Sequence, residues 1–178
     1  MIQYRRELPK LLKQLGLPMI GVEVGVAQGS FSWELLKNGM EKLYSVDAWK
    51  ELPQTGDGGF PQSWHDDNYE MAKEKLSEFG SQSVILKGIS HEMAKQIEDN
   101  SLSLVYLDGD HSLNGVRTDL AAWYPKLVIG GIIATHDYES PAYGTKEAFE
   151  EFAKNNGLEI HLLPEDQECD AGAFIIKK

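Results

Sequence analysis

Acidic and histidine side chains follow two apolar stretches of the chain at the points where those stretches end. Asp108 and Asp110 come directly after the first stretch, and His136 and Asp137 come directly after the second. Apolar runs that end abruptly in polar groups are typical of parallel strands, whose carboxyl ends lie along one edge of the sheet. Ligands bind at that edge in open α/β sheets. The sequence therefore predicts a chemical site where these two strands end.

Two carboxylates and an imidazole at this edge can hold a divalent metal ion. Mg²⁺ prefers carboxylate oxygens, whereas a histidine ligand favours Mn²⁺, Fe²⁺ or Zn²⁺. Such an ion lowers the pKa of a hydroxyl bound to it and orients that hydroxyl, and a remaining carboxylate such as Asp110 can accept the proton. The alternative is structural: the acids are solvated turn residues, and His111 and His136 are ordinary turn or core histidines.

A glycine turn near the N-terminus is a second candidate for ligand binding. The apolar run 19–24 is followed by Gly25 and Gly29 and then by a helix predicted over 30–37, which makes the first half of a βαβ unit. Glycines there let a ligand approach the backbone, and the helix N-terminus offers free N–H groups. The spacing Glu23-x-Gly25-x-x-x-Gly29 differs from the dinucleotide-binding fingerprint. A tight turn without a ligand is the alternative.

An acid closes the second predicted strand. This strand, over 43–47, ends at Asp47, which lies 24 residues after Glu23. An acid at this place in a nucleotide-binding α/β fold accepts hydrogen bonds from ribose hydroxyls. Taken alone, Asp47 could equally be an N-cap or a turn residue. Together, the glycine turn and the spaced acid indicate a nucleotide-like cofactor more strongly than either does alone.

The segment 48–65 interrupts the regular alternation of strands and helices. It contains aromatic residues among several glycines and prolines, and a loop of this length in a compact domain is usually functional or mobile. We predict a lid over the site, with Trp49, Phe60 and Trp64 as walls for a substrate or an adenine ring. An idle surface excursion is the alternative.

Two helix starts carry candidate caps. Ser63-x-x-Asp66 resembles a capping box and predicts that the third helix begins there. Ser90 follows the predicted strand 83–87 and its turn, and it is placed to cap a helix over 91–98. For Ser90 the functional alternative is contact with the base of a bound cofactor.

The whole chain alternates strands with helices and then closes with two strands. A helix over 5–15 begins the chain, and Gly130-Gly131 is expected to end the helix before the fifth strand. An acidic turn at 164–171 joins the last two strands in a predicted hairpin. The pattern indicates an α/β fold with a mostly parallel sheet and helices on both faces. Strands are predicted at 19–24, 43–47, 83–87, 104–107, 132–135, 158–163 and 173–176.

Length and composition favour one ordinary globular domain. The chain has 178 residues, 42% hydrophobic and 25% charged, and a net charge of −11 from 17 basic and 28 acidic residues. An acidic chain without a basic cluster is a poor candidate for nucleic-acid binding. The single cysteine, Cys169, excludes an intramolecular disulfide and a cysteine-based zinc site. Without a signal-like or membrane-spanning run, we expect a cytoplasmic domain over 1–178 that is a monomer or a homodimer.

These motifs together resemble the class I S-adenosylmethionine-dependent methyltransferases. The resemblance covers residues 19–178 and is carried by the glycine turn, by Asp47, by Asp108-Gly-Asp-His-Ser112, and by Gly130-Gly-x-x-x-x-His-Asp-Tyr138. The last two motifs are the more specific ones. They resemble the metal-dependent O-methyltransferases of macrolide, cephalosporin and aminocoumarin biosynthesis, of the macrocin and mycinamicin type.

The resemblance implies a Rossmann-like sheet of seven strands in the order 3-2-1-4-5-7-6, with the last strand antiparallel. In that fold Asp47 would bind the ribose hydroxyls and Ser90 would lie near the adenine. The full set of implied cofactor contacts is Glu23, Gly25, Gly29, Asp47, Ser90 and Asp108.

The resemblance also assigns the chemistry at the acid-tipped strands. It implies that Asp108 is a metal ligand and that Asp110 is the catalytic base. His136 and Asp137 replace two adjacent acidic ligands of the relatives, and the expected ion is Mg²⁺ or Mn²⁺. Only the helix at 5–15 and the loop at 48–65 are expected to cover a substrate.

The expected activity is O-methylation of a small hydroxylated acceptor, such as a sugar or a phenol, with S-adenosylmethionine as the methyl donor. An NAD-type dehydrogenase is a second possibility, which the glycine spacing disfavours. A third is a non-catalytic or degenerate nucleotide-binding Rossmann-like protein, which the exposed acid cluster disfavours.

Overall fold

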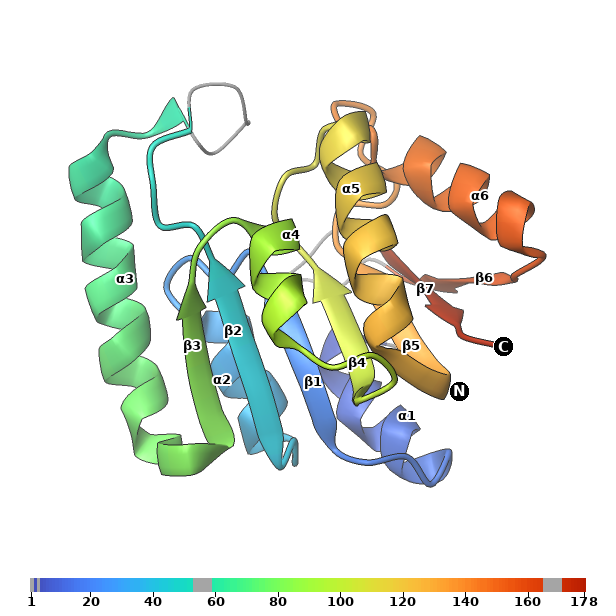
Figure 1. The fold of residues 1–178 in the computed structure, drawn as a ribbon, viewed down its shortest axis with the longest axis horizontal. Helices are drawn as coiled ribbons and strands as arrows, with labels where there is room; N and C mark the ends of the chain where they lie inside the picture. The colour runs from blue at the N-terminus through green and yellow to red at the C-terminus, as the bar shows by residue number, and fades with distance from the viewer. Residues whose placement is uncertain (1, 3, 53–58, 165–170) are drawn as a thin grey trace.

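The computed structural model describes residues 2, 4–52, 59–164 and 171–178. Within them, one sheet has the strand order β3-β2-β1-β4-β5-β7-β6 (Figure 1). The first five strands run parallel, and β7 is antiparallel to both β5 and β6. The predicted Rossmann-like order is confirmed. The strands are β1 (Ile20–Val24), β2 (Lys42–Asp47), β3 (Ser83–Lys87), β4 (Leu102–Leu107), β5 (Leu127–Thr135), β6 (Ile160–Leu163) and β7 (Gly172–Ile176).

Helices cover both faces of the sheet, as predicted. In Figure 1, α4 (Ser90–Met93), α5 (Leu113–Trp123) and α6 (Thr145–Asn156) lie in front of the sheet. Behind it lie α1 (Leu8–Gln14) and α2 (Ser30–Lys37), and α3 (Gln62–Leu76) stands beside β3. Short 3-10 turns extend several of these elements: η1 (Arg5–Glu7), η3 (Ser77–Gln82), η4 (Ala94–Gln96) and η5 (Tyr124–Lys126).

Side chains that alternate in direction along the central strands fill two separate hydrophobic cores, one on each face of the sheet. In β4, Val105 and Leu107 pack with α5 and α6, whereas Leu104 and Tyr106 pack with α1 and α2. Successive side chains of a strand point to opposite faces, so a strand covered on both sides must be apolar throughout. All six residues of β4 are buried accordingly. This rigid centre holds the carboxyl ends of β1 and β4 in place beneath the site.

The prediction of where α3 begins was wrong. The helix starts at Gln62 after an extended Pro61, and no side chain caps it. The side chain of Gln62 donates to Asp66 Oδ1 at 2.9 Å and to the carbonyl of Trp49 at 3.1 Å. Asp66 therefore stabilises the first turn from inside the helix, and Gln62 ties the helix to the segment that follows β2.

The role predicted for Gly130-Gly131 was also wrong. The preceding helix already ends at Trp123, and the two glycines lie inside β5. Gly130 N donates to Lys177 O, and Lys177 N donates to Gly131 O, both at 2.8 Å. The two glycines thus extend the hydrogen bonding between β5 and β7 to Lys177, the residue that follows β7. The helix predicted over 91–98 is also shorter, because the α-helical turns end at Met93 and a 3-10 turn follows.

Parts of two predicted features lie outside the described residues. They are the centre of the predicted lid, with Pro53, Gly56 and Gly58, and most of the acidic turn, with Cys169. Among the helices that the structure does describe, none combines the length and the apolar character needed to cross a membrane.

Candidate active site

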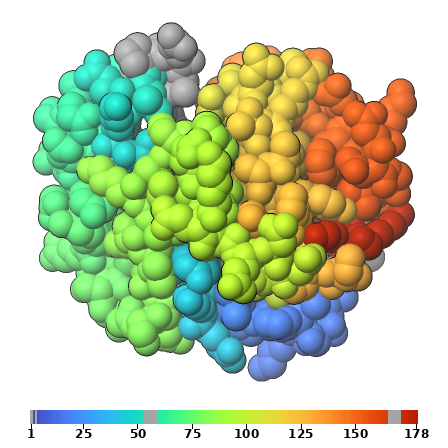
Figure 2. Space-filling view, viewed as in Figure 1, coloured from blue at the N-terminus to red at the C-terminus, as the bar shows by residue number. Residues whose placement is uncertain are grey.

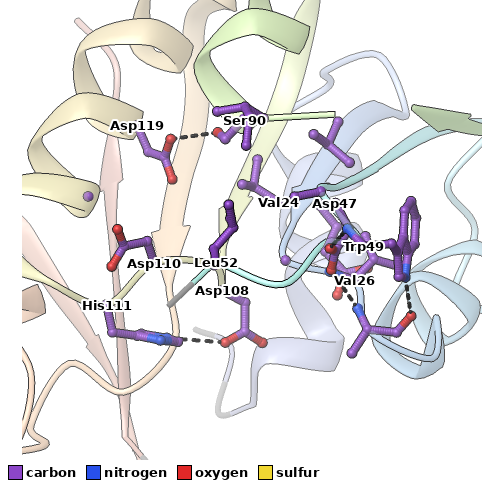
Figure 3. A pocket seen from close by; sticks show the side chains of 18 of the residues that line it. Val24, Val26, Asp47, Trp49, Leu52, Ser90, Asp108, Asp110, His111 and Asp119 are labelled. Atoms are coloured by element: carbon purple, nitrogen blue, oxygen red, sulfur yellow. Dashed lines mark hydrogen bonds and ion pairs between the residues drawn. The ribbon is translucent and has the colours of Figure 1, made fainter. Parts of the chain in front are cut away.

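A cavity of about 970 Å³ opens at the carboxyl ends of β1, β2 and β4. It is lined by the glycine turn, by residues that follow β2, by the turn before α4 and by the segment between β4 and α5. Figure 2 shows a notch at the top of this face, beside the yellow residues at the start of α5. The volume is at the upper end of the roughly 300–1,000 Å³ typical of ligand pockets. The cavity's lining contains six of the predicted site residues, with Gly29, His136 and Asp137 outside it; the six are Glu23, Gly25, Asp47, Ser90, Asp108 and Asp110, several of which Figure 3 labels.

The glycine turn is shaped by a close approach of two strand ends. Gly25 has φ +87°, and a Cβ at this position would lie 2.1 Å from the carbonyl oxygen of Asp108. Only glycine fits, because any side chain would overlap the backbone after β4. Gly29 is left-handed with φ +75° and precedes the first residue of α2. It lies against α3, where its Cβ would meet Ala72 at 3.3 Å.

Glu23 lies at the end of β1 and is buried, with 2% of its surface exposed. Its carboxylate accepts a hydrogen bond from Ser32 on α2, and Ser32 Oγ lies 2.6 Å from Ser45 Oγ. Burial raises the pKa of Glu23 well above its ordinary value, against the opposing effect of the Ser32 hydrogen bond. The glutamate borders the cavity beneath the glycine turn.

Asp47 fixes the backbone of the glycine turn. Its Oδ2 accepts the N–H groups of Val26 at 2.8 Å and Ala27 at 2.9 Å, and its Oδ1 accepts the N–H of Trp49 at 2.7 Å. Ala27 and Trp49 have φ values of +46° and +39°, so the acid holds two non-glycine residues in the left-handed region. Oδ2 carries two bonds and Oδ1 carries one. Oδ1 therefore keeps more capacity for a further donor.

The three aromatic residues that we predicted as walls for a substrate or an adenine ring lie in different environments. Trp49 is 1% exposed, packs with Val26 and Ala72, and donates from Nε1 to the carbonyl of Ala27 at 2.9 Å. It borders the cavity, as predicted, and supports the glycine turn from within the core. Trp64 lines the cavity, and Phe60 stacks on it at 4.5 Å while remaining 45% exposed.

Ser90 does not cap a helix, because it is the first residue of α4 and Ile89 takes the N-cap position. Its hydroxyl donates to Asp119 Oδ1 at 2.5 Å and accepts from Trp123 Nε1 at 2.8 Å. Asp119 is buried, and burial is the main cause that raises its pKa from 3.8 to about 6. Ser90 and Asp119 both border the cavity, so they form a polar wall on its α5 side (Figure 3).

Four side chains meet where β4 and β5 end. Asp108 Oδ1 lies 3.4 Å from His111 Nε2 and 3.4 Å from His136 Nδ1. Asp137 reaches the same two imidazoles, with Oδ1 2.9 Å from His136 Nδ1 and Oδ2 3.7 Å from His111 Nε2. The structure thus joins three of the predicted site residues and adds His111, which the sequence argument left as a turn or core histidine. We call Asp108, His111, His136 and Asp137 the edge cluster.

Asp110 borders the cavity but lies apart from the edge cluster. Its Oδ1 accepts the N–H of Ser112 at 2.9 Å. A Cβ on Gly115, in the first turn of α5, would lie 2.3 Å from Asp110 Cγ. In Figure 3 its carboxylate is turned away from the contact between His111 and Asp108. Glycine at 115 therefore makes room for this acid at the start of α5.

Comparison with known families decides the identity of the chain. A family model described as "Methyltransferase domain" matches residues 20–138, two thirds of the sequence. The chain belongs to this methyltransferase family. The matched span contains the glycine turn, Asp47 and the whole edge cluster. The family expected from the sequence, the methyltransferases, is confirmed.

Solved structures share the fold of this methyltransferase. A putative caffeoyl-CoA O-methyltransferase from Staphylococcus aureus matches with a TM-score of 0.72 and 17% identity, covering 100% of this chain and 86% of that one. The O-methyltransferase NovP matches with a TM-score of 0.72 and 18% identity, covering 97% and 77%. At these identities the likeness concerns the fold, which is that of the class I methyltransferases.

A sequence relative is much longer than the methyltransferase described here. The uncharacterized protein y4gI of Sinorhizobium fredii (strain NBRC 101917 / NGR234) is 27% identical over 103 residues, which are 58% of this chain. The matched region is 11% of y4gI, so the methyltransferase corresponds to a small part of that protein's length.

Arg5 brings a positive charge into the methyltransferase site. Its Nη1 lies 3.7 Å from Asp108 Oδ2 and donates to the hydroxyl of Tyr106 at 3.2 Å. The guanidinium also lies 4.5 Å from the centre of the Phe31 ring. The two oxygens of Asp108 therefore face different partners: Oδ1 faces the histidines and Oδ2 faces the arginine.

Sequence reasoning missed three residues of this site, and only two of them carried a signal in the sequence. His111 is three residues after Asp108, close enough to return to the same strand end. Asp119 lies between Val116 and Leu120 on the apolar face of α5, where a lone acid is unusual. Arg5 gave no signal in the sequence, because its approach to Asp108 depends on how η1 packs beside α2.

Proposed function

We propose that this methyltransferase transfers a methyl group from S-adenosylmethionine to a hydroxyl oxygen of a small acceptor, with a divalent metal ion at the edge cluster. The observation that carries the proposal is one cavity that extends from the glycine turn to Asp108 and His111 of the edge cluster. One end offers backbone and carboxylate groups for a nucleoside, and the other offers ligands for a metal. A cavity of this volume has room for both a cofactor and a small acceptor.

At the cofactor end, the chain would bind S-adenosylmethionine through Glu23, Gly25, Gly29, Asp47, Ser90 and Asp108. Asp47 has a carboxylate oxygen with spare capacity toward the cavity, which suits a ribose hydroxyl. Gly25 leaves the backbone open to close approach by a ligand. Ser90 and its partner Asp119 lie on the side where the adenine would be held. The cofactor supplies the sulfonium methyl group.

At the acceptor end, Asp108, His136 and Asp137 would hold the ion. The edge cluster has donors that fit one, because the ligand atoms of its members Asp108, His111 and His136 all lie within 4.8 Å of one another. A bound divalent ion polarises an acceptor hydroxyl and lowers its pKa. Asp110 borders the same cavity, and we assign it the role of general base that accepts the hydroxyl proton.

The chain's main contribution to the rate is alignment. Methyl transfer is an in-line displacement, and holding the two reacting atoms in line accounts for much of the acceleration in such reactions. The rigid ends of β1, β4 and β5 fix the two halves of the cavity relative to each other. The aromatic wall at Trp64 suits an acceptor with a ring, such as a phenol or a sugar.

Calorimetry with S-adenosylhomocysteine tests the first step of the proposal. We expect one site per chain, with affinity lost when Asp47 is replaced by alanine. Mass spectrometry of phenols and sugars incubated with the enzyme, S-adenosylmethionine and Mn²⁺ or Mg²⁺ tests the second step. Products should gain one methyl group on oxygen, and chelation of the metal should stop the reaction. No binding of S-adenosylhomocysteine would contradict the proposal, as would methylation that continues after chelation.

A further inference from the structure

We infer that His111 is a metal ligand and that the edge cluster selects a first-row transition ion over Mg²⁺. The inference rests on the proposed divalent-metal site, and it adds which residues bind the ion and which ion they prefer. A site of Asp108, His111, His136 and Asp137 presents two imidazoles and two carboxylates.

The distances that join Asp108, His111 and His136 are those of ligands around one ion, since their ligand atoms all lie within 4.8 Å of one another. Metal–ligand bonds of about 2.1 Å at angles of about 90–110° place neighbouring ligand atoms roughly 3.0–3.4 Å apart, and wider angles place them up to about 4.2 Å apart. His111 Nε2 lies 3.4 Å from Asp108 Oδ1 and 3.7 Å from Asp137 Oδ2. His136 Nδ1 lies 3.4 Å from the same oxygen of Asp108. Most of these distances exceed the roughly 2.7–3.2 Å of a good N–H···O hydrogen bond.

The ring of His111 is held in its orientation by its surroundings. The imidazole stacks on Tyr143 with ring centres 4.7 Å apart, and its backbone carbonyl accepts the N–H of Gly144 at 2.9 Å. A Cβ on Gly144 would lie 2.4 Å from Leu113, so this loop is packed tightly against the start of α5. These contacts limit the rotation of the His111 side chain.

The backbone of Asp137 and the charge of Arg5 direct the two carboxylates. Asp137 has φ +52°, an unfavourable conformation for a residue with a side chain, and this conformation turns its carboxylate back toward both imidazoles. Arg5 lies 3.7 Å from Asp108 Oδ2. Asp108 therefore offers Oδ1 to the centre of the cluster while its other oxygen is balanced by a cation.

The chemistry of the donors decides the ion. Mg²⁺ takes oxygen ligands and keeps several waters, whereas imidazole nitrogen suits Mn²⁺, Fe²⁺, Co²⁺ and Zn²⁺. Two nitrogens among four protein ligands shift the preference toward the transition ions. The methyltransferase would then use a nitrogen-rich site where its sequence resemblance implied a site of acids.

Calorimetric titration of the chelator-treated protein with CoCl₂ and with MgCl₂ tests the inference without acceptor or turnover. We expect Co²⁺ to bind at least about tenfold more tightly than Mg²⁺, and His111→Ala to weaken Co²⁺ binding by at least about tenfold with little effect on Mg²⁺. His161→Ala is the matched control, because His161 lies on the edge strand β6 and stacks on Phe174. It should leave Co²⁺ affinity unchanged.

A second measurement on the wild-type protein avoids reliance on folding of the variant. In imidazole-detected ¹⁵N NMR, Zn²⁺ should shift the ring nitrogens of His111 and His136 and leave those of His161 in place. Equal affinity for Mg²⁺ and Co²⁺, an unchanged Co²⁺ affinity in His111→Ala, or an unmoved His111 ring would each overturn the inference. If no metal binds at all, the metal part of the proposed function fails as well, while titration with S-adenosylhomocysteine still reports on its methyl-donor part.

Discussion

The two ends of the cavity are built in different ways. At the cofactor end, Asp47 accepts three backbone N–H groups at 2.7–2.9 Å, so the turn is shaped by bonds within the chain. At the edge cluster, imidazoles and carboxylates face each other mostly at 3.4–3.7 Å. The first end is therefore preformed by local backbone geometry. The second end is an assembly of side chains whose mutual distances suit an ion between them.

The largest effect should come from Gly25, which joins the two ends through its contact with the backbone of Asp108. Gly25→Ala places a Cβ where the carbonyl of Asp108 lies, and we expect a loss of more than about 4 kcal/mol in the free energy of unfolding, measured by chemical denaturation. Gly39→Ala is the control, since Gly39 has φ +107° with no atom near its Cβ. It should cost only about 1–3 kcal/mol. Equal losses would show that the close approach is unimportant.

Substitution of Asp110 tests proton transfer separately from cofactor binding. Asp110→Asn keeps the oxygen that accepts the N–H of Ser112, so the start of α5 should survive. We expect the rate of methyl transfer to fall by about 10²–10⁴, because the base is lost. The affinity for S-adenosylhomocysteine should stay nearly the same. Full activity of the variant would assign the base to another residue.

Asp119 tests the polar wall on the α5 side of the cavity. Its folded-state pKa of about 6 lies above its ordinary value of 3.8, so folding favours the protonated form. Its contribution to stability is complete below pH 3.8 and is lost as the pH rises through about 6. Relative to Asp119→Asn, the wild type should lose up to roughly 3 kcal/mol of unfolding free energy over that pH interval. Parallel stability curves for the two proteins would contradict the raised pKa.

A smaller effect is expected from Asp47→Asn, which replaces one acceptor oxygen by a donor. At least one backbone N–H then faces an NH₂ group, and we expect a loss of about 1.5–3 kcal/mol in the binding of S-adenosylhomocysteine, measured by calorimetry. Asp67→Asn, on the exposed face of α3, is the control and should bind normally. Unchanged binding in Asp47→Asn would mean that neither this acid nor the turn bonds that it accepts contribute to cofactor binding.

The contrast between local backbone geometry and contacts of distant side chains explains which features of the structure could be predicted from the sequence. The glycine turn, Asp47 and the strand order depend on short-range spacing and on a fold with a recognisable pattern, so they could be predicted. The start of α3 could not be, since it depends on Gln62 reaching Trp49 across the loop. The partners of Ser90 were missed for a similar reason, because Asp119 and Trp123 come from α5 and meet it only in the folded chain. The Ser90 hydroxyl forms hydrogen bonds with those two side chains and does not cap a helix.

The most direct test of the central claim is whether the methyl donor and the metal ion meet in one cavity. S-adenosylmethionine labelled with ¹³C at its methyl group can be bound to the protein with Mn²⁺, and Zn²⁺ serves as the diamagnetic reference. We predict a strong paramagnetic acceleration of the methyl carbon's relaxation with Mn²⁺, which disappears in Asp108→Ala. Binding of both ligands without any change in that relaxation would contradict the claim.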